Sequence, residues 1–94
     1  MSKSLISNNK ECLFCGTSLN LHKHHIYGGV ANRKLSEKYG CWVYLCGFHH
    51  NMSGAGVHFD KHSDIQLKQL CQRMWERKYG DREKFIETFG KSYL

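Results

Sequence analysis

Two short stretches of the chain have the pattern of strands, and the C-terminal third has the spacing of helices. Residues 19–27 predict a strand whose alternate side chains face opposite sides, and residues 41–46 combine β-branched and aromatic side chains typical of a strand. Residues 32–39 favour a two-turn helix that ends at Gly40. From Ser63 onward apolar residues recur at helical spacing. The recurring residues are Leu67, Leu70, Cys71, Met74, Trp75 and Tyr79.

The C-terminal segment carries residues that can begin and end helices. Ser63 or Asp64 can cap the first helix, and Asp81 and Gly90 can begin and end a second short one. We expect the aromatic residues of these helices to form a packing face over one side of a small core. These residues are Trp75, Tyr79, Phe85 and Phe89. Residues 1–10, by contrast, are polar and without periodicity, which predicts a loose tail.

The length of 94 residues allows one small domain, so residues 1–94 are expected to form a single unit. A core of this size gives little stability, and a bound metal or a disulfide would add to it. No apolar run is long enough to cross a membrane. The first ten residues lack the apolar stretch of a secretory signal, so a cytoplasmic location is expected.

The chain is basic, with a formal net charge of +6 when its histidines are neutral. That sign suits a polyanionic partner, with nucleic acid the first candidate. Many soluble proteins are equally basic, however, so the charge alone does not distinguish a nucleic-acid-binding protein from one whose basic residues are only solvated. The cysteines and histidines are more informative about function.

The cysteines are arranged for metal binding rather than for disulfides. Their number is odd and no secretory signal precedes them, which argues against a disulfide framework. Two ligand pairs have the spacing of a zinc site: Cys12-x-x-Cys15 and Cys46-x-x-His49. Together they predict a closed structural zinc site, the alternative being that Cys15 and Cys46 are ordinary buried thiols. Cys71 fits the apolar face of a helix, whereas the role of Cys41 stays open.

The remaining histidines suggest a second site. His24 and His25 are neighbours on a predicted strand and point to opposite faces, so one can bind a metal while the other reaches a substrate. His50 directly follows the zinc pair, and His58 follows a glycine-rich link. An ion bound by two or three histidines, with open coordination positions, would have the character of a catalytic site. Two further histidines are expected on the surface, His22 and His62.

The succession of motifs CLFCG, HKHHIYGG, CWVYLC and CGFHH resembles the HNH endonuclease family, especially its small, zinc-stapled, phage-associated members. The resemblance implies an α+β fold with a ββα-metal (His-Me finger) core, in which two strands and a helix surround one divalent ion. It covers residues 11–62, and residues 63–94 would form a helical C-terminal extension outside the shared core.

Carried onto this sequence, the resemblance assigns roles to three histidines. His24 corresponds to the first metal ligand, His25 to the general base, and His50 to the metal ligand at the start of the family helix. Neutral His25 would take a proton from water, and the hydroxide would attack the phosphorus. Imidazole ligands suit Mn²⁺, Ni²⁺, Co²⁺ or Zn²⁺ as well as Mg²⁺, so the ion is not identified by its ligands.

The sequence departs from the family pattern at two positions. The family's middle asparagine, which orients the loop that bears the base, is replaced by Cys41. Asn32, Asn51 or backbone contacts would have to take over that task. The family's last histidine commonly lies one helical turn after the second metal ligand, where this chain has Gly54. His58 is the nearest replacement as a third ligand.

We therefore expect a metal-dependent DNA endonuclease of low sequence specificity, associated with a phage or mobile element. Its partners would be double-stranded DNA and phage packaging or recombination proteins, in the cytoplasm of a bacterial or phage-infected cell. The candidate phosphate contacts are Lys23, Arg33, Lys34 and Lys38. The alternative is a catalytically inactive, zinc-stapled module that binds DNA or serves phage packaging.

Overall fold

The computed structural model describes residues 3–50 and 60–94, which form a small α+β protein. The described elements are β1 (Leu21–His25), α1 (Val30–Tyr39), β2 (Trp42–Cys46), α2 (Gly47–His50), α3 (Lys61–Lys78) and α4 (Arg82–Phe89). The two strands and the three longer helices lie where the sequence pattern predicts them. The first strand begins later than expected because Asn20, at φ 54°, has a left-handed backbone that interrupts an extended chain.

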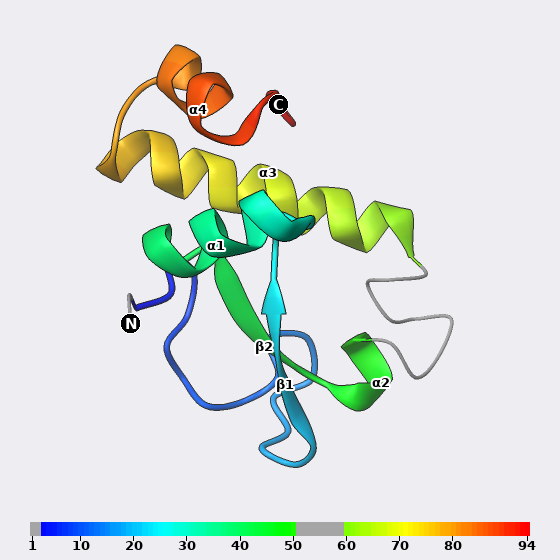
Figure 1. The fold of residues 1–94 in the computed structure, drawn as a ribbon. Helices are drawn as coiled ribbons and strands as arrows, with labels where there is room; N and C mark the ends of the chain where they lie inside the picture. The colour runs from blue at the N-terminus through cyan, green and yellow to red at the C-terminus, as the bar shows by residue number, and fades with distance from the viewer. Residues whose placement is uncertain (1–2, 51–59) are drawn as a thin grey trace.

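The two strands form an antiparallel sheet whose connection contains a whole helix (Figure 1). In the register Leu21 lies opposite Cys46 and His25 lies opposite Trp42. The predicted alternation of side chains is visible in exposure, since His24 is 5% exposed while the His25 side chain retains 25%. Neighbouring histidines therefore sit in different surroundings.

Helix α1 is fixed to the segment that follows β1 by hydrogen bonds at its C-terminal half. The buried Ser36 hydroxyl donates to the Tyr27 carbonyl at 3.1 Å and accepts from the Tyr27 N–H at 3.2 Å. Gly40 ends the helix with φ 78°, a left-handed conformation that glycine adopts without the steric cost of a Cβ. The chain then enters β2 with the Cys41 carbonyl accepting from the Ile26 N–H at 2.9 Å.

The aromatic residues of α3 and α4 form the expected packing face. Trp75, Phe85 and Phe89 are each less than 5% exposed; Phe85 and Phe89 contact the fully buried Tyr27, and Trp75 packs against Phe85. Tyr79, expected in the same face, lies beside Trp75 but is 37% exposed. The Tyr27 and Phe89 rings lie 4.7 Å apart between centroids. Cys71 is fully buried in the same cluster, as its helical position predicts. The C-terminal helices therefore complete the hydrophobic core.

One expected helix cap is wrong and another is confirmed. Helix α3 is capped by Asp60, whose carboxylate accepts from the backbone N–H groups of His62 and Ser63, and not by Ser63 or Asp64. The apolar pattern did not reveal the true start of the helix, because the residues of its first turn are polar and do not pack into the core. Asp81 caps α4 as predicted, and its carboxylate accepts from the Lys84 N–H at 2.9 Å.

The described part of the N-terminal segment is not the loose tail that its polar composition predicts. Ser4 is buried, and its hydroxyl donates to the Trp42 carbonyl at 2.6 Å. The Leu5 N–H donates to the Gly40 carbonyl at 2.9 Å, and Leu5 and Ile6 pack against the core. A few polar contacts anchor this segment where α1 leads into β2.

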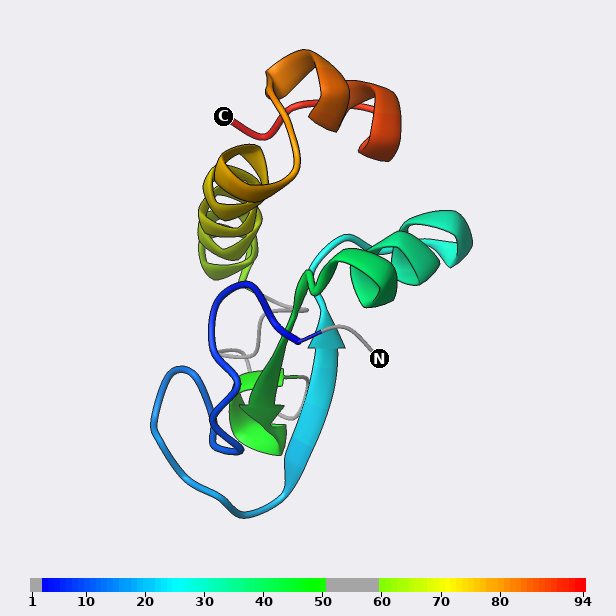
Figure 2. The ribbon, with the colours of Figure 1, turned by 90° about the vertical axis from the view of Figure 1, so that its left-hand side faces the viewer.

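In two perpendicular views, α4 lies at one end of the molecule and α2 near the other (Figures 1 and 2). Helix α3 lies between α4 and the strands in Figure 1. The paired strands thus lead from the helical end toward α2 and the cysteine-bearing loop. None of the described helices combines the length and the apolar character needed to span a membrane.

Candidate metal centre and histidine pocket

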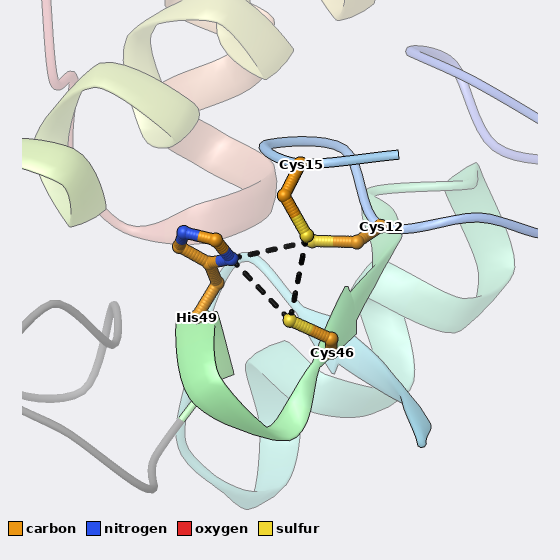
Figure 3. Close-up of side chains that lie close together, drawn as sticks. All are labelled: Cys12, Cys15, Cys46 and His49. Atoms are coloured by element: carbon orange, nitrogen blue, oxygen red, sulfur yellow. Dashed lines mark hydrogen bonds between the residues drawn. The ribbon is translucent and has the colours of Figure 1, made fainter. Parts of the chain in front are cut away.

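The four predicted zinc ligands converge at the α2 end of the sheet (Figure 3). We call this group the Cys₃His cluster; it consists of Cys12, Cys15, Cys46 and His49. Each residue offers a donor atom within 4.8 Å of the other three. The sequence prediction that these residues come together is confirmed.

Local backbone structure accounts for each half of the Cys₃His cluster. Gly16, at φ 76°, allows a tight turn in which its N–H donates to the Cys12 carbonyl at 2.8 Å. Cys46 ends β2, and the single turn of α2 that follows places His49 three residues later on the same side. Each turn thereby presents two donors, and the two turns face one another.

The spacing of the donors fits a tetrahedral zinc ion. Zinc with sulfur ligands at about 2.3 Å and nitrogen at about 2.0 Å has tetrahedral edges of about 3.8 Å between sulfurs and about 3.5 Å between sulfur and nitrogen. The Cys15 and Cys46 sulfurs lie 3.7 Å apart. The Nδ1 atom of His49 lies 3.7 Å from the Cys12 sulfur and 3.3 Å from the Cys46 sulfur.

The surroundings of Cys12 favour a thiolate, the form that binds metal. Burial opposes its ionisation, but hydrogen bonds from the backbone N–H groups of Cys46, Cys15 and Phe14 outweigh burial and lower the pKa of Cys12 to about 6. Cys46 is also buried, while Cys15 is exposed. Three sulfurs and one imidazole with no open position are typical of a structural zinc site.

A separate pocket of about 320 Å³ opens between β1, α1 and α2. We call it the histidine pocket; it is lined by Lys23, His24, His25, Gly28, Gly29, Arg33 and His50. Three imidazoles and two permanent cations line it, and this lining contains no carboxylate. The pocket therefore offers an anionic group several positive or hydrogen-bonding partners.

Within the histidine pocket, His50 lies against two histidines of β1. The His24 and His50 rings contact edge to face with centroids 5.3 Å apart. His22 is not the free surface residue that the sequence suggests, because its Nδ1 lies 2.9 Å from the Nδ1 of His50. That contact holds the His50 ring against β1. His62 is exposed, as expected.

In residues 3–50 and 60–94 no second group of three His, Cys, Asp or Glu side chains is as close together as the Cys₃His cluster. His24 and His50 accordingly form a pair of imidazoles rather than a closed set of ligands. The expected third ligand, His58, lies outside the described residues, as does Asn51.

His25 has a carboxylate partner that sequence reasoning missed. Its Nε2 lies 2.8 Å from Oε2 of Glu37, and the other oxygen of that carboxylate accepts from the Lys23 ammonium at 2.6 Å. Hydrogen bonds from Lys23 and His25 lower the pKa of Glu37 below its usual range. The only signal in the sequence was an acidic residue within an otherwise basic helix, which does not reveal its partner.

Cys41 stands where the pattern that the sequence resembles has an asparagine, and it lies in the core. Cys41 is fully buried and its side chain faces the core, where the hydrogen bond with the Cys71 thiol and, after it, burial raise the pKa of Cys41. Its backbone carbonyl, rather than its side chain, holds the chain after His25 through the bond from Ile26. The side-chain amide of Asn32 donates to the Phe89 carbonyl at 3.3 Å.

The basic residues chosen from the sequence occupy different places. Lys23 and Arg33 line the histidine pocket. Arg33 and Lys34 also line an adjoining hollow of about 410 Å³, together with His25, Val30 and Glu37. Lys38 lies at the far end of α1 with its ammonium over the Tyr39 ring, 5.2 Å from the centroid.

Comparison with protein-family models, curated proteins and solved structures finds no match to this chain. The class of protein therefore rests on the Cys₃His cluster, the fold and the chemistry of the histidine pocket. The fold and the cluster define a small α+β protein with a candidate zinc site.

Proposed function

We propose that this protein is a metal-dependent endonuclease of the HNH type, which hydrolyses phosphodiester bonds in DNA with low sequence specificity. In this proposal β1, β2 and α2 correspond to the ββα-metal core. The observation that carries it is the histidine pocket, where His24, His25 and His50 line one hollow with Lys23 and Arg33.

The pocket suits a phosphodiester because its lining carries positive charge and hydrogen-bond donors without a carboxylate. Arg33 would bind the phosphate through two parallel N–H groups, and Lys23, whose ammonium also pairs with Glu37, would add positive charge beside it. Such contacts position the backbone of the nucleic acid but carry no information about its bases. Weak sequence preference follows from that contact pattern.

His24 and His50 would hold a divalent ion, which supplies electrostatic stabilisation of charge on the phosphate and the leaving oxygen. The pair fits this task because a buried imidazole of β1 and an imidazole of α2 contact one another at the pocket. With two protein ligands, the remaining coordination positions stay open to water and phosphate.

His25 would act as the general base. It lines the same pocket as His24 but retains solvent exposure, so it can accept a proton from water beside a bound phosphate. The Cys₃His cluster would not take part in the reaction. Its closed donor set would bind a structural zinc. Because His49 directly precedes His50, the cluster also fixes the position of His50 in the histidine pocket.

A nicking assay on supercoiled plasmid tests the proposal. Wild-type protein should nick the plasmid with at least one of Mg²⁺, Mn²⁺, Ni²⁺ or Zn²⁺, and His25→Ala should lower the rate roughly 100-fold or more. His62→Ala is the matched control, because it removes an exposed histidine of α3 that does not line the pocket. Equal inactivity of wild type and His25→Ala with every ion would end the endonuclease proposal.

A second candidate is a DNA-binding module that retains the fold without cleavage. The burial of Cys41 in the core favours this second function. The HNH family uses a side-chain amide at that position, whereas here a thiol faces the core. This module would bind duplex DNA with equal affinity in wild type and His25→Ala and would nick with neither. Filter binding or fluorescence anisotropy on the same samples separates the two functions.

A further inference from the structure

Glu37 of α1 makes two contacts with β1 through a single carboxylate. Its Oε2 lies 2.8 Å from Nε2 of His25, and its Oε1 lies 2.6 Å from the Lys23 ammonium. Lys23 is also held by the Trp42 ring, whose centroid lies 4.3 Å from the ammonium nitrogen. The carboxylate is therefore fixed on one side, which leaves its second oxygen aimed at one nitrogen of His25.

The chemistry of that contact determines where the His25 ring carries its proton. An ionised carboxylate only accepts hydrogen bonds, so the nitrogen facing it has to be the donor. Both neighbours of Glu37 favour its ionised form. In a neutral imidazole with hydrogen on Nε2, the lone pair that can accept a proton lies on Nδ1.

We propose that Glu37 is the positioning residue of the general base: it binds the Nε2–H group of His25 and thereby presents Nδ1 as the atom that takes the proton from water. This role rests on the proposed endonuclease function. A helix side chain thereby orients the base, a task for which the HNH family uses an asparagine. At that position this chain has Cys41, whose thiol is buried in the core.

The placement of Glu37 agrees with action through His25 rather than on the substrate. Glu37 lines the adjoining hollow but is not among the residues that line the histidine pocket. His25 lines both hollows, so its ring connects the Glu37 carboxylate with the histidine pocket. A carboxylate that does not itself line the histidine pocket orients the base without contacting a bound phosphate.

Glu37→Gln keeps the size of the side chain and removes the obligate acceptor. We expect kcat of plasmid nicking to fall roughly 10- to 100-fold, with little change in KM. Asp64→Asn is the matched control, since Asp64 is a helix carboxylate bound to Lys68 at 2.8 Å, away from the pocket. In a His25→Ala background, Glu37→Gln should cause no further loss, because the residue acts through the ring that is missing.

The tautomer of His25 is a second measurement that does not depend on activity. Long-range ¹H–¹⁵N correlation spectra of the wild type should show the Nε2–H form, and Glu37→Gln should reduce its population while Asp64→Asn leaves it unchanged. An Nδ1–H form in the wild type, or a kcat for Glu37→Gln equal to that of the control, would overturn the inference. An inert wild type with the Nε2–H form intact would instead refute the endonuclease function while leaving the Glu37–His25 arrangement established.

Discussion

Replacing Cys46 with alanine removes one donor of the Cys₃His cluster, and Cys71→Ala provides a close comparison. Both thiols are buried, Cys46 at 6% exposure and Cys71 at 0%, so both substitutions lose a similar small apolar group. That loss costs about 1 kcal/mol of unfolding free energy. Any cost of Cys46→Ala beyond this amount reports the lost metal ligand.

The extra cost is large compared with the stability of a chain this short. Structural zinc sites bind with apparent free energies of about 10–16 kcal/mol in zinc-finger peptides, whereas whole domains unfold with about 5–15 kcal/mol. We therefore expect Cys71→Ala to lower the melting temperature by about 4–8 °C. Cys46→Ala should lower it by at least about 15 °C or abolish the cooperative transition.

Metal content by elemental mass spectrometry and thermal unfolding by circular dichroism measure the two effects together. Wild type and Cys71→Ala should each hold one zinc ion per chain after dialysis, and Cys46→Ala should hold much less. Excess EDTA should destabilise wild type to the level of the Cys46 variant. Equal melting temperatures for both variants, with a folded wild type free of zinc, would refute the structural zinc site.

Two further predictions concern the backbone and a helix cap. Gly40→Ala should cost about 2–3 kcal/mol, because the new Cβ combines a left-handed φ of 78° with a collision against the Lys3 carbonyl. Gly90→Ala, at φ 101° with open space around it, should cost only about 1 kcal/mol in the same urea titration, and equal costs would contradict the steric argument. At the α3 cap, hydrogen bonds from Ser63 and His62 lower the pKa of Asp60. The charged carboxylate therefore stabilises the fold at every pH above the ordinary pKa of an aspartate, and this stability is lost as the pH falls through the lowered pKa. Wild type should therefore exceed Asp60→Asn in stability at pH 7 and match it in strong acid, and a pH-independent difference would count against the lowered pKa.

Features that depend on neighbouring residues were predictable from the sequence. The spacing of Cys12 and Cys15 implies a turn with two donors, and Asp81 with Gly90 delimits α4, because capping involves atoms only a few residues apart. The alternation of His24 and His25 likewise follows from strand geometry.

Features that depend on distant pairings were not predictable in the same way. Glu37 binds His25 from twelve residues away, and His22 meets His50 across twenty-eight. Ser4 contacts the Trp42 carbonyl across thirty-eight residues, although its surroundings in the sequence look like a loose tail. No local pattern encodes these partners, because they are set by how α1, α2 and the N-terminal segment pack on the sheet.

The antiparallel register has a chemical consequence. A strand that slips by one residue exchanges its two faces. Such a slip of β1 would move His24 out to the solvent and His25 inward, so the residue proposed to bind the ion and the residue proposed to accept the proton would trade places. The Cys₃His cluster fixes the strand pair at the Cys46 end, and the Ile26–Cys41 hydrogen bond fixes it at the other end. These two anchors therefore determine which imidazole is buried and which is exposed, and with that the proposed role of each.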